Sequence, residues 1–190
     1  MANSTLQFFG YQGKWARVDL SSRKMNVEPA DPAFYHDYIG GRGVQVRLLY
    51  EHLKKIGPLK NPLGPENRIV IGTGAPNDTF IPTAGRGSCS FVSPMTRSPE
   101  PAPWIPNHQP LSGLITHSSA GGLFPNMLKR TGIDHLIIDG RADKPVRILV
   151  TEGKVEVIDA EEDLFEVVDG KKAVRPASAI TNFLTQKYPG

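Results

Sequence analysis

Alternation of polar and apolar residues near the start of the chain predicts a β-hairpin. Residues 14–20 read KWARVDL, with Ala16, Val18 and Leu20 between polar neighbours, a pattern typical of a half-buried strand. Polar residues at 21–24 interrupt this pattern, and a second short run follows at 25–28. We therefore expect neighbouring antiparallel strands joined by a turn.

Residues after this hairpin predict a pair of helices. Asp31 is a favourable N-cap and Pro32 is favourable in a first helical turn, so a short helix should begin there and end at Gly40-Gly41. A second helix is expected at about 44–54. Its apolar residues follow the helical period closely enough to form one buried stripe, made of Val44, Leu48, Leu49 and Leu53.

The rest of the chain is dominated by short strands. Apolar or alternating runs predict them at 68–72, 88–93, 114–117, 134–139, 146–151 and 155–159. Further helices are predicted at 121–130, with Pro125 in the opening turn and Gly132 as the stop, and at 176–188. With 190 residues, we expect a single domain spanning 1–190.

Glycine, proline and cysteine content refines this picture. The 19 glycines and 17 prolines indicate much irregular backbone, above all at 94–110, where the proline density excludes a regular helix or a central strand. Trp104 in this loop should pack against the body of the protein or against a partner chain. Cys89 is the only cysteine, so any iron-sulfur cluster must come from a partner chain, and Cys89 itself suits a core position better than a nucleophilic role.

Charge and terminal sequence exclude other classes of function. The formal net charge is only +3 and the basic residues form no run, which argues against nucleic-acid binding. The first residues lack the charged start and apolar stretch of a signal peptide, and no apolar run is long enough for a membrane span. We therefore expect a cytoplasmic protein.

Glycine-framed arginines are the strongest candidates for ligand contact. Gly40-Gly41-Arg42-Gly43 and Gly85-Arg86-Gly87-Ser88 combine backbone that can approach a ligand closely with a donor fork suited to phosphate or carboxylate oxygens. The competing interpretation is an ordinary corner between helices, and it applies more to Arg42 than to Arg86.

A third glycine-rich corner lies at 118–122, where we expect a helix N-terminus. Backbone N–H groups and the positive end of a helix dipole would make Ser119, Ala120, Gly121 and Gly122 a site for an anion. A serine-capped helix without a ligand explains the same residues. Adjacent His117 is a candidate pocket neighbour; the histidines show no metal-ligand spacing, and we assign no catalytic residue.

Taken in order, several segments resemble the N-terminal domain of the aldehyde ferredoxin oxidoreductase family of tungsten or molybdenum enzymes. The resemblance is strongest over 9–159, and the proline-rich loop at 94–110 looks like an insertion. The matching segments are GKWARVDL at 13–20, GGRG at 40–43 with LLY at 48–50, PLGPEN at 62–67, GRG at 85–87, SP at 93–94 or its echo QPLSG at 109–113, SAGGLF at 119–124, and the run from Asp134 to Pro145.

The resemblance implies an α+β fold, largely antiparallel sheets with a few short helices, that forms a base for a metal held by two pterin dithiolenes. It implies cofactor contacts from Arg86, Gly87 and Ser88 and from the segment Ser119 to Gly122, while Arg42 becomes part of a structural corner. The family usually has asparagine where this chain has Ser119, and that residue's main-chain oxygen helps to hold a magnesium ion. A main-chain ligand survives this substitution.

On this basis the chain is expected to be the cofactor-base subunit, or an N-terminal fragment, of a tungsten or molybdenum pterin oxidoreductase acting on aldehydes or carboxylates. A larger cysteine-containing chain would carry the 4Fe-4S cluster and pass electrons to ferredoxin or an iron-sulfur subunit. The chain alone should not be active. The alternative is a structural or assembly subunit that keeps the fold without the metal cofactor, with the proline-rich loop as its contact surface.

Overall fold

The protein is described by a computed structural model that covers residues 10–95, 114–169 and 171–188. Its main element is a six-stranded sheet with the order β2-β1-β6-β3-β4-β5. The strands are β1 (Lys14–Asp19), β2 (Lys24–Pro29), β3 (Ile69–Gly72), β4 (Gly87–Val92), β5 (Ile115–Ala120) and β6 (His135–Asp139). Among the described strand pairs, β1 with β6 is parallel and all others are antiparallel. This architecture confirms the expected α+β class.

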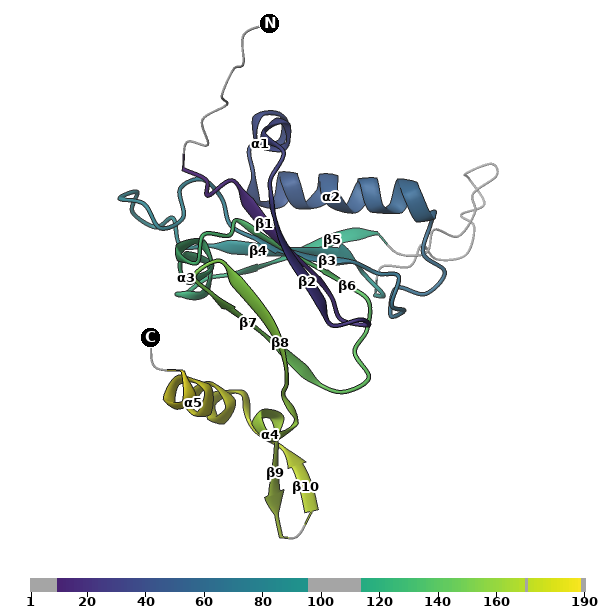
Figure 1. Cartoon of the computed structure of the whole chain (residues 1–190), viewed down its shortest axis with the longest axis vertical. Helices are drawn as coiled ribbons and strands as arrows, with labels where there is room; N and C mark the ends of the chain where they lie inside the picture. The colour runs from purple at the N-terminus through teal and green to yellow at the C-terminus, as the bar shows by residue number, and fades with distance from the viewer. Residues whose placement is uncertain (1–9, 96–113, 170, 189–190) are drawn as a thin grey trace, which may run out of the picture.

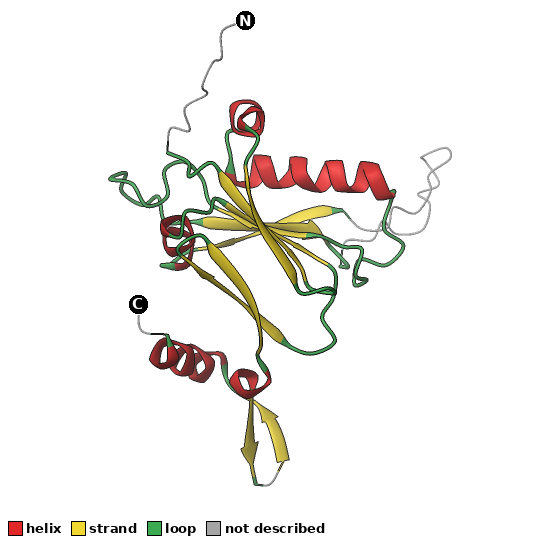
Figure 2. Cartoon of the chain, in the orientation of Figure 1, coloured by secondary structure: helices red, strands yellow, loops and turns green. Residues whose placement is uncertain are grey.

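Helices α1 (Pro32–Tyr38) and α2 (Gly41–Ile56) cover one face of this sheet (Figures 1 and 2). Asp31 caps α1 by accepting a hydrogen bond from Ala33 N at 2.9 Å, as its position before Pro32 predicts. The core beneath these helices is formed by Trp15, Ala30, Tyr35, Val44, Leu48, Leu49, Val70 and Ile137. Val44, Leu48 and Leu49 of the predicted stripe therefore lie in this core, whereas Leu53 is half-buried and lies outside it.

A second core lies on the opposite face of the sheet. There the hairpin of β7 (Val146–Thr151) and β8 (Lys154–Asp159) packs over β1 and β6 together with α3 (Phe124–Arg130) (Figure 1). The buried residues of this layer are Ala16, Val18, Leu128, Ile133, Leu136 and Val155. Strand β1 thus contributes alternate residues to the two cores, which is what its period-two pattern requires.

The C-terminal part of the described chain extends beyond the β7–β8 hairpin (Figure 1). It consists of α4 (Glu161–Leu164), the hairpin of β9 (Phe165–Val168) and β10 (Lys171–Val174), and α5 (Ala177–Lys187). The sequence predicted only the last helix. A salt bridge between Arg147 of β7 and buried Asp163 ties this part to the hairpin above it.

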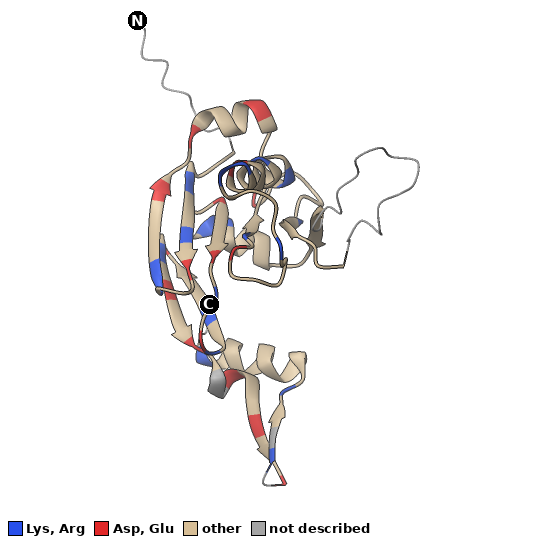
Figure 3. Cartoon of the chain, turned by 90° about the vertical axis from the view of Figure 1, so that its right-hand side faces the viewer, with Lys and Arg blue, Asp and Glu red and all other residues tan. Residues whose placement is uncertain are grey.

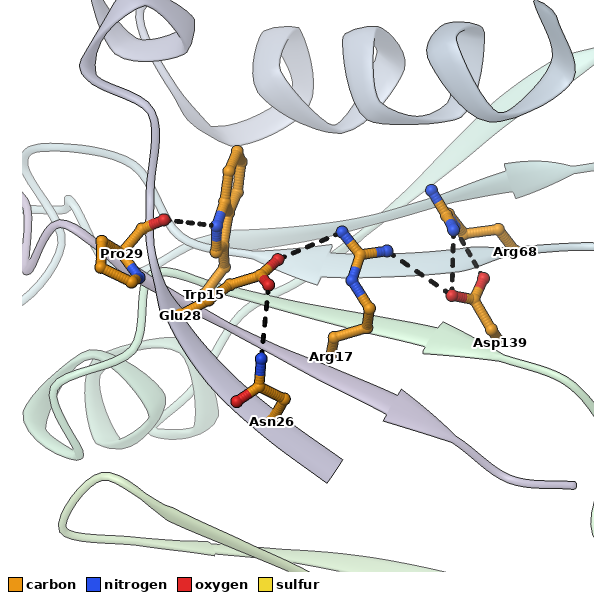
Figure 4. Close-up of polar contacts among 7 residues, drawn as sticks. All are labelled: Trp15, Arg17, Asn26, Glu28, Pro29, Arg68 and Asp139. Atoms are coloured by element: carbon orange, nitrogen blue, oxygen red, sulfur yellow. Dashed lines mark hydrogen bonds and ion pairs between the residues drawn. The ribbon is translucent and has the colours of Figure 1, made fainter. Parts of the chain in front are cut away.

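A row of ion pairs crosses the helix-covered face of the sheet (Figure 4). Arg17 lies between Glu28, at 3.2 Å, and Asp139, at 3.7 Å, while Arg68 binds both oxygens of Asp139 at 2.7 and 2.9 Å. Lys, Arg, Asp and Glu all occur along the strands drawn in Figure 3.

Several expected boundaries change. Helix α2 begins at Gly41, so Arg42 lies in its first turn, and β5 continues through Ala120, so α3 begins only at Phe124. The prediction that Ser119 to Gly122 form a helix N-terminus is therefore wrong, and so is the serine cap, because the residue at the N-cap of α3 is Leu123. The proline-rich loop lies outside the described residues, except for Pro94 and Met95.

Candidate functional site

A cavity of about 400 Å³ opens where the ends of β3, β4 and β5 meet the beginning of α2. Both glycine-framed arginines and two residues of β5 line it, although these segments are far apart in the sequence. The full lining is Gly41, Arg42, Gly72, Gly74, Pro76, Asn77, Thr83, Ala84, Arg86, Gly87, Ser88, His117 and Ser119. The fold therefore brings the separate sequence candidates into one site.

Arg42 enters the cavity because α2 begins beside the end of β3. Gly41 N donates to Thr73 O at 3.1 Å, and Gly40 forms an isolated β-bridge with Gly74. From this first turn, Arg42 Nη1 lies 2.9 Å from His117 Nε2 on β5. Arg42 is thus at the expected corner between helices and, in addition, at the site.

Arg86 is positioned by a loop that is braced from inside by Asn77. This asparagine is only 2% exposed; its Nδ2 donates to Ala84 O at 2.8 Å and to Arg86 O at 3.1 Å, while its Oδ1 accepts from Gly74 N at 2.6 Å. The braces hold the backbone of Arg86. Within the described residues, its guanidinium has no hydrogen bond or ion pair, so its donors remain available to a ligand.

Gln45 performs a similar role between α2 and β4. It is fully buried, its Nε2 donates to Ser88 O at 2.9 Å, and its Oε1 accepts from Ser88 Oγ at 3.1 Å and Ser90 Oγ at 2.7 Å. Every polar atom of the amide is therefore used inside the protein. These bonds fix Ser88 at the wall of the cavity relative to Arg42, three residues before Gln45 on the same helix.

Close packing requires glycine at the floor of the cavity. A Cβ on Gly72 would lie 2.2 Å from His135 Cδ2, and a Cβ on Gly87 would lie 3.0 Å both from Gly72 O and from Pro125 Cβ. The imidazole of His135 is fully buried directly beneath this floor, and Nε2 lies 3.4 Å from Gly41 O. The floor is thus formed by the glycine backbone, which packs directly against the buried imidazole of His135.

Buried polar groups form a second layer below. Asp134 accepts hydrogen bonds from Gly13 N at 2.8 Å and from the Tyr35 hydroxyl at 3.2 Å, and Lys129 Nζ donates to Gly74 O at 2.8 Å and Ala75 O at 2.7 Å. Burial raises the pKa of Asp134 and lowers that of Lys129; it also lowers the pKa of His135 to about 4. His135 is therefore neutral at physiological pH, and Lys129 secures the loop that follows β3.

The electrostatics of the cavity favour an anion. Arg42 and Arg86 contribute positive charge, and among the described residues no Asp or Glu lines the space to neutralise it. The hydroxyls of Ser88 and Ser119 add donors at one wall. In the described part of the chain, no three His, Cys, Asp or Glu side chains gather as metal ligands, so this donor set fits the oxygens of an anionic group better than direct coordination of a metal.

The expected site residues divide into two groups. Arg86, Gly87, Ser88 and Ser119 line the cavity, whereas Ala120, Gly121 and Gly122 are exposed beyond the described lining. Ser88 and Ser119 are directly opposed in the β4–β5 pairing, which explains how these distant segments meet. Cys89 is half-buried, and burial raises the pKa of its thiol, so it fits neither a fully buried core position nor the role of a nucleophile closely.

Fold and cavity together define an α+β domain with an arginine-lined pocket beside its main sheet. The chain belongs to the aldehyde ferredoxin oxidoreductase family: the sequence model of that family's N-terminal domain matches residues 15–102 and 105–184. None of the described helices is long and apolar enough to cross a membrane.

The chain is similar to a small part of each of several longer proteins. It is 34% identical over 152 residues to the tungsten-containing aldehyde ferredoxin oxidoreductases of Pyrococcus furiosus and Thermococcus kodakarensis, covering 80% of this chain and 22% of each relative. An aliphatic sulfonate oxidoreductase, WOR-like subunit, of Pyrococcus furiosus is 29% identical over the same length. The chain thus spans about a fifth of the length of these relatives.

A solved structure with the same fold is the active site complex BamBC of benzoyl coenzyme A reductase, in complex with 1,5-dienoyl-CoA. The TM-score is 0.74 at 22% sequence identity, and the match covers 94% of this chain and 23% of that chain. At this level of identity the likeness concerns the fold alone.

Proposed function

We propose that this chain forms the cofactor base of a tungsten or molybdenum pterin-dependent oxidoreductase that acts on aldehydes or carboxylates. One observation carries the proposal: Arg42 and Arg86, from segments far apart in the sequence, both line a glycine-rich cavity that no described carboxylate lines. Uncompensated arginines beside closely approachable backbone suit the phosphates of a pterin cofactor. Family membership supplies the class of cofactor, because the relatives are tungsten-containing enzymes.

In this proposal the residues of the chain bind and orient the cofactor. Arg86 would pair with phosphate oxygens, Gly87 and Ser88 would allow the cofactor to approach the backbone, and Ser119 to Gly122 would supply further contacts, with the main-chain oxygen of Ser119 as a magnesium ligand. The bound metal centre supplies two-electron redox chemistry. Asn77 and Gln45 keep the contact residues in place, and we assign no catalytic acid or base to this chain.

We further propose that another chain completes the enzyme in the cytoplasm. The curated relatives are far longer than this chain, which covers 22% of their length, and Cys89 is its only cysteine. A 4Fe-4S cluster, which requires several cysteine ligands, therefore belongs to a partner, as does electron transfer to ferredoxin.

Metal and pterin analysis of the native complex tests this proposal. The chain is purified with its bound partners as wild type, as Arg86→Ala and as Arg141→Ala, a control at an exposed arginine outside the cavity. We expect Arg86→Ala to lower tungsten or molybdenum content with unchanged thermal stability, and Arg141→Ala to change neither. Absence of both metals and of pterin from every complex would refute the proposal and leave a non-catalytic assembly subunit as the function.

A further inference from the structure

We infer that the outer edge of β5, together with the groove between β5 and α2, is a docking surface for an extended segment of the larger chain that completes the enzyme. That segment adds to the main sheet as a further β-strand and places alternate apolar side chains in the groove. The inference rests on the proposed function, since the occupant is the partner proposed there.

Strand β5 ends the six-stranded sheet with unused backbone groups. Among the described strands it pairs only with β4. Val92 of β4, opposite Ile115, directs its backbone away from β5: Val92 O accepts from Asn67 Nδ2 at 2.9 Å, and Val92 N donates to Asn67 Oδ1 at 3.3 Å. Because antiparallel pairs alternate, the N–H and C=O groups of Ile115 and His117 point to the outer edge, where they have no backbone partner within the described residues.

This edge lacks the features that usually protect a sheet from pairing with another chain. The six residues of β5 read ITHSSA and include no Lys, Arg, Asp, Glu or Pro. The strand at the opposite edge of the same sheet, β2, carries Lys24 and Glu28 and ends at Pro29. One edge is thus blocked by charge and proline, whereas the other is open to an added strand.

An apolar groove of about 430 Å³ lies beside the open edge, between α2 and the start of β5. Val46, Tyr50 and Ile115 line it, and Val46 and Tyr50 are 38% and 52% exposed. Helix α2 packs over this end of the sheet, so the groove lies on the helix-covered side of β5 (Figure 1). An added strand presents every second side chain to that side, so one segment with apolar residues at alternate positions would pair with the edge and fill the groove.

Arg47 holds one wall of the groove in place. Its guanidinium carbon lies 5.5 Å from the ring centroid of Tyr38 and 5.7 Å from that of Tyr50. Arg47 Nη1 donates to the Tyr38 hydroxyl at 3.1 Å, and Nη2 pairs with Glu51. Since Glu51 balances the charge of Arg47, the groove suits apolar side chains rather than an anion. Tyr and Arg around an apolar hollow are also the residues that contribute most to affinity in many protein–protein interfaces.

The position of the groove indicates which partner occupies it. Arg42 lines both the groove and the arginine-lined cavity, and His117 and Ser119 of β5 line that cavity too. A chain that closes the cavity over a bound cofactor therefore reaches the groove and the edge of β5 directly. This chain covers only 22% of the length of its tungsten-containing relatives, and a second copy of it would supply none of the missing polypeptide.

Hydrogen exchange, measured residue by residue on the 190-residue chain alone and on its native complex, tests the inference. In the chain alone, the amides of Ile115 and His117 should exchange rapidly, while those of Thr116 and Ser118, which face β4, should be protected. In the complex, exchange at Ile115 and His117 should slow by at least about tenfold. Chemical cross-links from this edge should reach the larger chain.

Two variants alter different parts of the surface. Val46→Lys places a charge in the groove at an exposed helical position, and Ile115→Pro removes an outward N–H, at a place where an edge strand tolerates proline. Each should weaken binding to the larger chain, separated from the native complex and titrated with each variant, by roughly tenfold or more. Leu63→Lys is the matched control, since Leu63 is an exposed apolar residue that does not line the groove, and it should bind as the wild type does. Thermal unfolding of each variant shows whether it is folded.

Equal exchange at Ile115 and His117 in the chain alone and in the complex would overturn the inference, as would wild-type affinity in Val46→Lys and Ile115→Pro. Cross-links from β5 only to a second copy of this chain, or a native preparation without a larger chain, would also overturn it. Protection of the β5 edge by the larger chain in a complex without tungsten, molybdenum or pterin would refute only the cofactor proposal. Metal and pterin in a complex whose β5 edge stays unprotected would refute only the docking surface.

Discussion

Replacement of Gly72 by alanine tests whether the floor of the cavity is as closely packed as the structure indicates. The added Cβ would lie 2.2 Å from His135 Cδ2 and 2.7 Å from Nε2. No left-handed backbone conformation is involved at Gly72, so the effect is purely steric. The clash must be relieved by movement of β3 or of the imidazole.

The imidazole has little room to move. His135 is fully buried, its Nδ1 lies 3.4 Å from the Tyr35 hydroxyl and its Nε2 lies 3.4 Å from Gly41 O. Overpacking of a core of this kind costs about 1–3 kcal/mol. For a protein of this size, that corresponds to a fall in Tm of roughly 2–4 °C for each kcal/mol.

Urea denaturation of Gly72→Ala should therefore show a lower midpoint with an unchanged m-value. Gly121→Ala is the control, because a Cβ there meets nothing within 4 Å, and its free energy of unfolding should stay within about 0.5 kcal/mol of wild type. In a His135→Ala background the cost of Gly72→Ala should largely disappear. The same cost in both backgrounds, or a cost below about 0.5 kcal/mol in the wild-type background, would show that the floor is not formed as described.

Three other substitutions test the layers around the cavity. Burial lowers the pKa of His135 from 6.5 to about 4, so the unfolded chain binds the proton first, and the free energy of unfolding should fall by roughly 2–3 kcal/mol between pH 7 and 4. His135→Gln should reduce this fall when the free energy of unfolding is measured as a function of pH. The raised pKa of Asp134 makes the folded protein more stable as pH falls, but it does so equally in the wild type and in the variant. Asn77→Ala should cost about 1–3 kcal/mol in chemical denaturation and lower the tungsten or molybdenum content of the native complex, because it removes the hydrogen bonds that hold the backbone of Arg86. Asp139→Ala should cost about 1–3 kcal/mol, measured in the same way, by leaving half-buried Arg68 without its carboxylate, and a loss below about 0.5 kcal/mol would contradict the role of this ion pair.

Local periodicity predicted the regular elements well. The alternating pattern at 14–20 and 25–28 indicated the hairpin that the structure confirms, with Lys14 opposite Pro29 and Asp19 opposite Lys24. The cap at Asp31 and the apolar stripe of α2 were also visible, because both depend on residues close in sequence.

Elements that depend on distant pairing were harder to predict. Ser118 to Ala120 have no periodic pattern and, beside Gly121 and Gly122, suggest a helix start, yet they continue β5 because Gly87 to Cys89 of β4 lie opposite them. Hairpin β9–β10 was missed, since its strands are only four residues each. In these segments partner strands, rather than intrinsic propensity, decide the structure.

The site could be predicted only in part, because it too depends on contacts between segments that are far apart in the sequence. Glycines around Arg86 signalled close approach of a ligand, but the sequence could not show that the first turn of α2 brings Arg42 to β5. Gln45 does carry a signal in the sequence: it is a polar residue adjoining Val44 on the buried side of a helix, where an amide needs partners. Asn77 carries no comparable signal, because an asparagine that is buried in a loop cannot be distinguished from an ordinary turn residue by sequence alone.

The parallel pairing of β1 with β6 has a consequence for how the protein is made. Trp15 aligns with His135, so β1 is synthesised long before β6, the strand with which it pairs. Until then β1 has only β2 beside it, and a lone hairpin is marginally stable in water. Non-local pairing of this kind slows folding and leaves strand edges exposed in the meantime. We therefore expect the nascent chain to depend on chaperones until β6 has left the ribosome, and the cavity, whose floor rests on His135, to form only at that stage.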